Sequence, residues 1–357
     1  MYSIGDKVRV TIFGQSHSGA IGAIIDGLPP GVTLDTKKIA AFMQRRRPGQ
    51  SKLTTARNET DIPEIVSGLY GGKTCGAPIC AIIKNSDTKS GDYDNLKLVP
   101  RPGHADFAAY MKYGGNNDIR GGGQFSGRMT APMCFAGAVC MQILEDRGIT
   151  IGAHIAEIHG IRDEKFDAVN ISAKQLDEIA RKEFPTVSDA AGAEMKAEIE
   201  RAKAAGDSVG GIVECAVIGM KPGVGGALFE GLEGEISKAV FAIPAVKGIE
   251  FGAGFSVAEM FGSENNDEFF AGKGTVRTKT NNHGGILGGI SSGMPIIFRA
   301  AFKPTPSIAK KQQSVNLMTG ENEELIIKGR HDPCVVQRAV PCVESAAAIT
   351  VLNLLGE

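Results

Sequence analysis

The chain has 357 residues, 42% of them hydrophobic, so it is long enough to bury one large core or two ordinary ones. Lysine plus arginine number 39 and aspartate plus glutamate 40, and the formal net charge of -1 excludes a general electrostatic attraction to nucleic acid or anionic lipid. Seven cysteines without CxxC spacing predict reduced thiols in a cytoplasm, and the N-terminus lacks the apolar run of a secretory signal.

The first part of the chain is predicted to form short strands and amphipathic helices. Apolar runs between turn residues predict strands at 8–13, 21–25, 64–66 and 78–84. Asp35 is suited to cap a helix that extends to about Arg47, where Pro48 ends it. The polar stretch that follows is predicted to be a long functional loop, and two helices flank a glycine-rich turn. These segments are 85–103 for the loop and 105–113 and 129–147 for the helices.

The second part predicts a similar mixture. The expected elements are strands at 149–158 and 210–218, a charged helical region at 163–203, a hairpin formed by 286–290 and 295–302, and a closing helix at 341–355. A weak internal repeat relates 23–32 to 216–224, each with a helix after it, and chance similarity is the alternative to a duplication for so short a match. Strands and helices do not alternate regularly, which favours α+β layers over a doubly wound sheet.

Three motifs resemble nucleotide or nucleic-acid sites without meeting their requirements. Residues 67–74 end like a P-loop, but Ser67 replaces the first glycine and no long apolar helix follows. The run 121–127 does not fit G-x-G-x-x-G, so a Rossmann site is not expected. The arginines of 45–47 lack a second basic stripe with aromatic residues, and a solvated helix end is the simpler interpretation of that run alone.

Several separated segments instead have the composition of a site for a polyanion. Each sets a histidine or arginine among glycine, proline, serine or threonine, where the backbone can approach a ligand closely. They are 14–19, 45–52, 101–106 and 328–333, with the glycine-rich segments 120–128 and 281–293. Together they provide guanidinium groups, backbone N–H donors and imidazoles, which are the groups that bind phosphate and carboxylate and transfer protons near neutral pH.

The motifs GQSHSG, RRRPG, RPGHAD, RGGGxxSGR, AVKGIEFG, NNHGGILGGISSG, KPTPS and GRHDPC occur in the order found in chorismate synthases, so the whole chain resembles that family. The resemblance implies a lyase that uses reduced FMN for the 1,4-anti elimination of phosphate from 5-enolpyruvylshikimate 3-phosphate. The product, chorismate, is the last common intermediate of the shikimate pathway to aromatic amino acids. The resemblance also implies a layered α+β sandwich of antiparallel sheets and helices with an internal duplication. We expect a cytoplasmic homotetramer whose single catalytic domain, 1–357, has two pseudo-repeated halves that divide near 160–210.

The resemblance also implies catalytic roles. His17 would give a proton to the leaving phosphate, and His104 would protonate or polarise the reduced flavin at N1. Asp332, with Ser16, would relay the proton abstracted near flavin N5. For each histidine the alternative is a hydrogen bond that only holds a turn, and for Asp332 it is an ion pair with Arg330 or an Asx-turn.

The remaining site residues are contacts to anions and to the flavin. Cations expected on the substrate's phosphate and carboxylates, or on NADPH for the first two, are Arg46, Lys52, Arg128 and Arg338. Flavin contacts carry over to Gln124, Phe125, Ser126, Pro244, Ala245, Gly288, Lys303, Pro304, Thr305, Pro306, Ser307 and Arg330. Many relatives have Arg-Ser-Ser at 124–126, and here an amide that can hydrogen-bond a flavin carbonyl replaces the cation.

Other partners follow from the same comparison. No metal, nucleic acid or membrane is expected, and the absence of a recognisable reductase domain suggests an external flavin reductase, with NADPH as a source of electrons. His283 either lines the site or supports its glycine loop, and His154 and His159 are expected to be structural. Two rival functions are a flavin oxidoreductase with net hydride transfer and a basic-loop RNA-binding protein.

Overall fold

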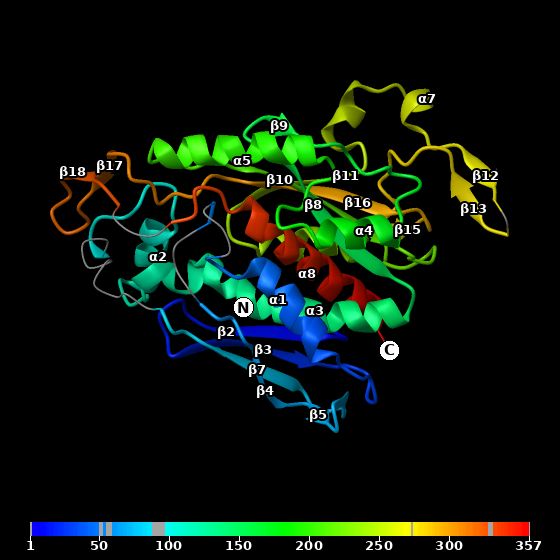
Figure 1. The fold of residues 1–357 in the computed structure, drawn as a ribbon, viewed down its shortest axis with the longest axis horizontal. Coiled ribbons are helices and arrows are strands. Elements are labelled where there is room, and N and C mark those ends of the chain that lie inside the picture. The colour runs from blue at the N-terminus through cyan, green and yellow to red at the C-terminus, as the bar shows by residue number, and fades with distance from the viewer. Residues whose placement is uncertain are drawn as a thin grey trace.

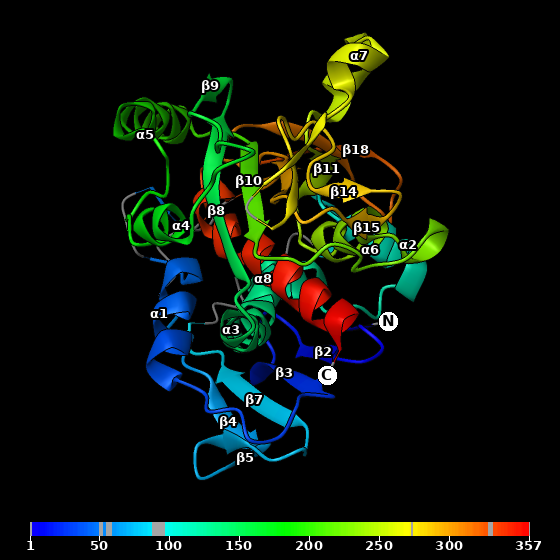
Figure 2. The same ribbon diagram turned by 90° about the vertical axis from the view of Figure 1, so that its right-hand side faces the viewer.

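The computed structural model describes residues 2–49, 53–54, 59–87, 97–272, 274–327 and 331–356. Two five-stranded antiparallel sheets enclose a layer of helices (Figures 1 and 2). The first sheet has the order β1 (Ser3–Ile4), β2 (Arg9–Gly14), β3 (Ala20–Asp26), β7 (Ile79–Lys84), β4 (Glu64–Ser67). The second has the order β11 (Val246–Phe251), β16 (Ile296–Phe302), β10 (Gly211–Ile218), β8 (Thr150–Ile158), β9 (Ile161–Arg162). The predicted α+β sandwich is therefore confirmed.

The helix layer consists of α1 (Thr36–Arg46), α3 (Thr130–Asp146) and α8 (Val336–Leu355). Asp35 caps α1 as predicted, since its carboxylate accepts the N–H groups of Lys37 at 2.8 Å and Lys38 at 3.2 Å. α3 and α8 are apolar on all sides because both lie between the sheets, and they approach closely at Gly137. α8 is long and apolar enough to cross a membrane, but 78% of its most apolar stretch is buried inside the fold, as in a core helix.

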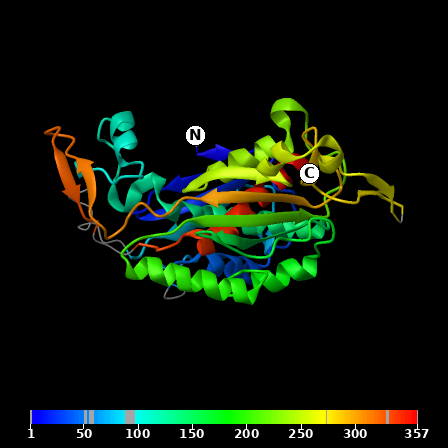
Figure 3. The ribbon, with the colours of Figure 1, turned by 90° about the horizontal axis from the view of Figure 1, so that it is seen from above.

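The remaining elements cover the sheets or project from them. Helices of this kind are α2 (Asp106–Tyr113), α4 (Ala173–Ala180), α5 (Asp189–Ala204), α6 (Leu232–Phe241) and α7 (Gly262–Asn265). Strand pairs are β5 (Leu69–Tyr70) with β6 (Lys73–Thr74), β12 (Phe269–Ala271) with β13 (Val276–Thr278), β14 (Ile286–Leu287) with β15 (Ile290–Ser291), and β17 (Gln312–Val315) with β18 (Asn322–Leu325). Figure 3 shows the β12–β13 and β17–β18 pairs projecting at opposite ends of the molecule.

Three predicted elements were wrong in extent or pairing. The region 163–203 is not one helical stretch, because 163–172 carries no helix and the helical conformation is interrupted between α4 and α5, where Pro185 lies. The segment 295–302 does not pair with 286–290, because β16 lies between β10 and β11 and the tight hairpin forms within 286–291. α8 begins at Val336, so Pro341 lies inside it and not at its start.

The two sheets repeat one pattern of neighbours. In the first, β2, β3 and β7 are adjacent in that order, and α1 follows β3 in the chain. In the second, β8, β10 and β16 are adjacent in that order, and α6 follows β10 after a short 3-10 turn. β3 and β10 carry the two copies of the weak sequence repeat. The pattern is what a duplication would leave, and the duplication itself stays a prediction.

Candidate active site

A loop of three successive glycines brings the two predicted catalytic histidines together. Gly121, Gly122 and Gly123 have φ values of 59°, 82° and 53°, which only glycine adopts readily. A Cβ atom on Gly121 would lie 2.3 Å from the His17 ring and 2.5 Å from the Ser16 hydroxyl, and one on Gly122 would lie 3.1 Å from His104 Nε2. The loop therefore leaves just enough room for two imidazoles on neighbouring residues.

The turn that carries His17 is fixed by contacts to this loop and to the end of β7. Ser16 N donates to Gly123 O at 3.1 Å, and the Asn85 amide donates to Gln15 O at 3.1 Å and to Ser18 O at 2.7 Å. The carbonyl oxygen of the same amide accepts a hydrogen bond from Arg128 Nε at 2.9 Å. Asn85 thus links the His17 turn to a predicted anion-binding arginine. The role of Asn85 could not be predicted from the sequence, because only the folded chain brings its side chain to this place.

His104 is held by a buried carboxylate. Its Nδ1 lies 2.5 Å from Asp106 Oδ1, and Arg101 donates to both oxygens of the same carboxylate at 2.7 and 2.8 Å. Burial raises the pKa of Asp106, but the hydrogen bonds from Arg101 and His104 outweigh it and hold that pKa well below its usual range. An ionised Asp106 accepts a hydrogen bond from the N–H at His104 Nδ1, and His104 Nε2 then faces Gly122. The RPGHAD motif contained both partners, but we did not assign them roles from the sequence.

The segment after β16 lies against the His104 loop. Lys303 Nζ donates to Gly103 O, and Arg101 Nη1 donates to Ser307 Oγ at 3.4 Å. Lys303 N donates to Ala245 O at 2.9 Å, and Ala245 is one of the few residues other than glycine with a positive φ, at 75°. Burial, with the nearby charge of Lys247, lowers the pKa of Lys303. The structure thus places two groups of predicted flavin contacts, 244–245 and 303–307, beside His104.

Three predicted anion-binding arginines share one buried network. Asp61 accepts from Arg46 Nη1 at 2.9 Å and pairs with Arg128 Nη1, while Arg338 pairs with Asp332 at 2.5 Å and donates from Nε to Arg46 O at 3.0 Å. Burial raises the pKa of Asp61, but the charges of Arg46 and Arg128 outweigh it, so the pKa is lowered. Asp332 is therefore paired with Arg338, whereas Arg330, the ion-pair partner considered from the sequence, lies outside the described residues. Asp61 was missed, since nothing in its local sequence marks it.

The arginines differ in what remains available for a ligand. Arg46 is 2% exposed, and its donors contact Thr130, Asp61 and Gly127 O. Within the described part of the chain, Arg128 Nη2 is buried without a hydrogen-bond partner and lies 3.7 Å from Glu59. Such a donor is costly unless a ligand or water satisfies it.

Some predicted residues are not brought to this place. Gly288 is at the tip of the β14–β15 hairpin, which packs on the turn before α6 at the opposite end of the long axis from α2 (Figure 1). Ser126 lies beside Gly122, and on the same loop Gln124 is half-buried and Phe125 is exposed. Lys52 and Arg330 lie outside the described residues. Among the residues that are described, no group of three or more His, Cys, Asp or Glu side chains could hold a metal ion.

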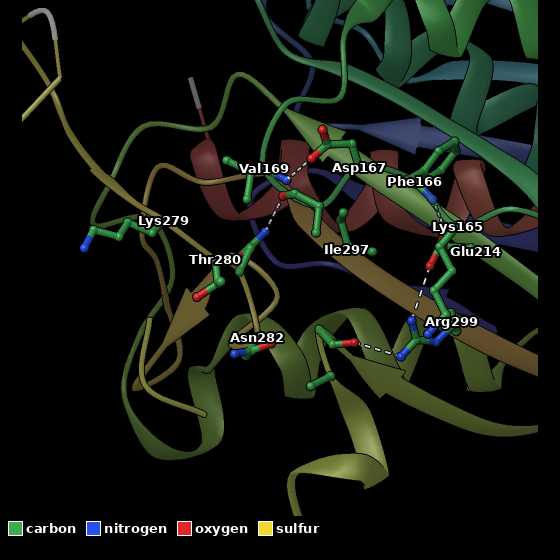
Figure 4. A pocket seen from close by; sticks show the side chains of 14 residues that line it. Lys165, Phe166, Asp167, Val169, Glu214, Lys279, Thr280, Asn282, Ile297 and Arg299 are labelled. Atoms are coloured by element: carbon green, nitrogen blue, oxygen red, sulfur yellow. Dashed lines mark hydrogen bonds and ion pairs between the residues drawn. The ribbon is translucent and has the colours of Figure 1, made fainter. Parts of the chain in front are cut away.

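A cavity of about 370 Å³ lies elsewhere, on the outer face of the second sheet (Figure 4). Its wall includes a row of paired charges across neighbouring strands, in which Glu214 bonds both His154 Nε2 at 3.0 Å and Arg299 Nη1 at 3.3 Å. The other nitrogen of His154 bonds Asp163 at 2.9 Å. Burial lowers the pKa of His154, but the two carboxylates outweigh it and raise the pKa. None of the predicted site residues lines this cavity.

Comparisons with known proteins agree with this arrangement. The family model described as chorismate synthase matches residues 8–355. The chain belongs to the chorismate synthase family. It is 49% identical over 353 residues to the chorismate synthase of Korarchaeum cryptofilum, covering 98% of this chain and 96% of that protein. It is 44% identical over 352 residues to that of Thermococcus kodakarensis, covering 98% of this chain and 96% of that protein. The chain also aligns with a crystal structure of chorismate synthase with a TM-score of 0.76 and 28% sequence identity. The alignment covers 99% of this chain and 92% of the chain in that structure.

Proposed function

We propose that this chain converts 5-enolpyruvylshikimate 3-phosphate to chorismate by 1,4-anti elimination of phosphate in the presence of reduced FMN. The observation that carries the proposal is the placement of His17 and His104 against adjacent glycines of one loop, next to a buried arginine network. An elimination of this kind needs a proton donor at the leaving phosphate, cations around it, and a second proton site nearby. The family membership supports the substrate and the cofactor named in this proposal.

The residues beside His104 fit a flavin. The glycine loop offers backbone that a flat ring can approach, because a side chain at 121 or 122 would collide with an imidazole. Thr305 Oγ1, in the segment expected to contact the flavin, is buried without a hydrogen-bond partner among the described residues. Lys303 adds a positive charge, and Phe125 an aromatic face, at the same loop cluster. When bound, reduced FMN supplies an electron transiently and assists removal of the unactivated ring hydrogen.

The chain's own residues then have separate tasks. His17 donates a proton to the departing phosphate, and His104, oriented by Asp106, holds a proton at flavin N1. Asp332 and Ser16 relay the abstracted proton. Arg128 and Arg338 bind the phosphate or carboxylates of the substrate. Burial, with the nearby charge of Arg46, lowers the pKa of Arg338. Arg46, whose donors are used within the protein, acts on the anion through its charge.

We also propose a cytoplasmic homotetramer that receives reduced flavin from an external reductase, with NADPH as the electron source. All seven cysteines are free thiols, which suits a reducing compartment. Large apolar side chains are exposed along the segment from the turn before α6 to β12, where Phe229 is 95%, Phe255 85% and Phe261 76% exposed. Three phenylalanine side chains this exposed within one segment are consistent with a surface that another copy of the chain covers, which supports self-association.

The experiment that tests the catalytic assignment replaces each histidine in turn. His17→Ala and His104→Ala should each lower the turnover of 5-enolpyruvylshikimate 3-phosphate with photoreduced FMN about 100-fold or more, because each removes a proton donor. Thermal denaturation serves as the control for folding. If either variant folds and keeps wild-type turnover, the role given to that histidine is refuted.

A further inference from the structure

A second histidine-centred arrangement lies in the loop between β13 and β16, apart from the His17 and His104 loop. His283 Nδ1 is hydrogen-bonded to Asp267, and His283 Nε2 lies 2.9 Å from the hydroxyl of Ser292. The His283 and Asp267 side chains are buried, at 7% and 5% exposed, while Ser292 is partly exposed. A serine, a histidine and an aspartate in this order of contacts are the parts of a serine nucleophile activated by a general base.

The aspartate is fixed and ionised. Besides His283 Nδ1, its carboxylate accepts hydrogen bonds from the backbone N–H of Asn282 at 2.8 Å and of His283 at 2.9 Å, and from Thr280 Oγ1 at 2.5 Å. Burial raises the pKa of Asp267, but the hydrogen bonds from Thr280 and His283 outweigh it, so the pKa is lowered. A carboxylate that accepts at Nδ1 places the proton of a neutral imidazole there, and the lone pair of Nε2 then faces the serine hydroxyl.

The serine is held in register with the histidine by the loop backbone. Ser292 N donates to Gly285 O at 2.9 Å, and the Asn281 side chain accepts from Gly285 N at 2.8 Å. Gly293, which follows the serine, is exposed and has no side chain that would cover the hydroxyl.

We propose that Ser292 is an activated nucleophile and a covalent modification site for small acyl and phosphoryl electrophiles. In the reaction with a phosphoryl fluoride, the bond from Ser292 Oγ to phosphorus forms and the phosphorus–fluorine bond breaks. The hydroxyl proton passes to His283 Nε2, and fluoride leaves. Asp267 acts through His283 as a positioning residue. This reactivity does not depend on the proposed chorismate chemistry, because the catalytic roles proposed above use none of its three residues.

The test treats the full-length protein with diisopropyl fluorophosphate and maps adducts by tandem mass spectrometry. The expected result is an adduct at Ser292, formed about 100-fold or more slowly in His283→Gln and also slowed in Asp267→Asn. Ser256 is the internal control, because it is exposed but its hydroxyl donates to Ala253 O at 2.6 Å and has no imidazole beside it. No adduct is expected there.

A second measurement keeps the proposal testable if a variant fails to fold, as judged by circular dichroism. In the wild-type protein the labelling rate should rise with pH and reach a plateau once the imidazole is neutral, whereas attack assisted only by hydroxide would rise tenfold per pH unit throughout. The proposal is overturned by the absence of a Ser292 adduct, by equal labelling of Ser256, by an unchanged rate in folded His283→Gln, or by a pH profile without a plateau.

Discussion

A single methyl group at Gly121 tests whether the glycine loop positions the catalytic histidine. The added Cβ would lie 2.3 Å from His17 Cε1, about 1 Å closer than the 3.4 Å at which ordinary contacts begin, so the imidazole must retreat by at least that much. A displacement of about 1 Å at a reacting group costs about 100-fold in rate. The φ of 59° adds roughly 1–2 kcal/mol of backbone strain for alanine. We therefore expect Gly121→Ala to lower kcat about 100-fold and to lower Tm modestly.

The assay is phosphate release from 5-enolpyruvylshikimate 3-phosphate with photoreduced FMN, measured beside thermal denaturation. Gly127→Ala is the matched control on the same loop, because a Cβ there meets nothing within 4 Å and the backbone is not left-handed. It should keep near wild-type turnover. A folded Gly121→Ala protein with unchanged kcat would show that catalysis does not require His17 to stay in this position and that the glycine loop does not position it.

Three further predictions concern other contacts. Asp106→Asn should lower kcat, measured by steady-state turnover, about 100-fold or more. The amide N–H would face His104 Nδ1 and disfavour the tautomer that carries its proton on Nδ1. The depressed pKa of Asp106 also means that its carboxylate stabilises the fold above about pH 3.9 and that this contribution is lost as the pH falls toward the folded pKa. His154→Gln should lower the free energy of unfolding, measured with urea at pH 6, by about 3–5 kcal/mol, because the buried carboxylates of Asp163 and Glu214 lose the cation between them. Since the pKa of His154 is raised, its contribution is complete below about pH 6.5 and declines as the pH rises through the folded pKa, so an equal cost at pH 9 would contradict the ion-pair account. Gly137→Ala should lower the free energy of unfolding by about 1–3 kcal/mol, because its Cβ would lie 2.3 Å from a side-chain atom of α8. Gly234→Ala in α6, which has open space around it, should raise the free energy of unfolding by about 0.5–1 kcal/mol. Similar unfolding midpoints for the two variants would contradict this difference in packing.

Local patterns predicted the elements that local physics determines. The cap at Asp35, the end of α1 before Pro48 and the core helix α3 all follow from short-range signals in the sequence. The pairing of β16 did not, because an apolar strand after a turn can join either neighbour, and only long-range contacts to β10 and β11 decide which. The alanine-rich composition of 163–203 likewise concealed the break at Pro185.

The candidate site divides in the same way. His17 and His104 could be found because each lies in a glycine motif that is itself the signal. Asp61 and Asn85 could not be found in this way, because their side chains bond to residues that are distant in the sequence. Asn85 bonds to Gln15 and Arg128, and Asp61 bonds to Arg128, over separations of 43 to 70 residues. The other partner of Asp61, Arg46, is nearer in the chain, but the turn that joins them is not evident from the sequence. Gly288 shows the converse: the resemblance groups it with the flavin contacts, and the fold of a single chain separates it from them.

The most direct test of the proposed function is anaerobic turnover of 5-enolpyruvylshikimate 3-phosphate by the wild-type protein with photoreduced FMN and added NADPH. Phosphate release and NADPH oxidation are both measured. The account predicts one phosphate per chorismate, no net NADPH oxidation per turnover, and no reaction with oxidised FMN. Absence of phosphate release with reduced flavin present, or consumption of one NADPH per product, would contradict it.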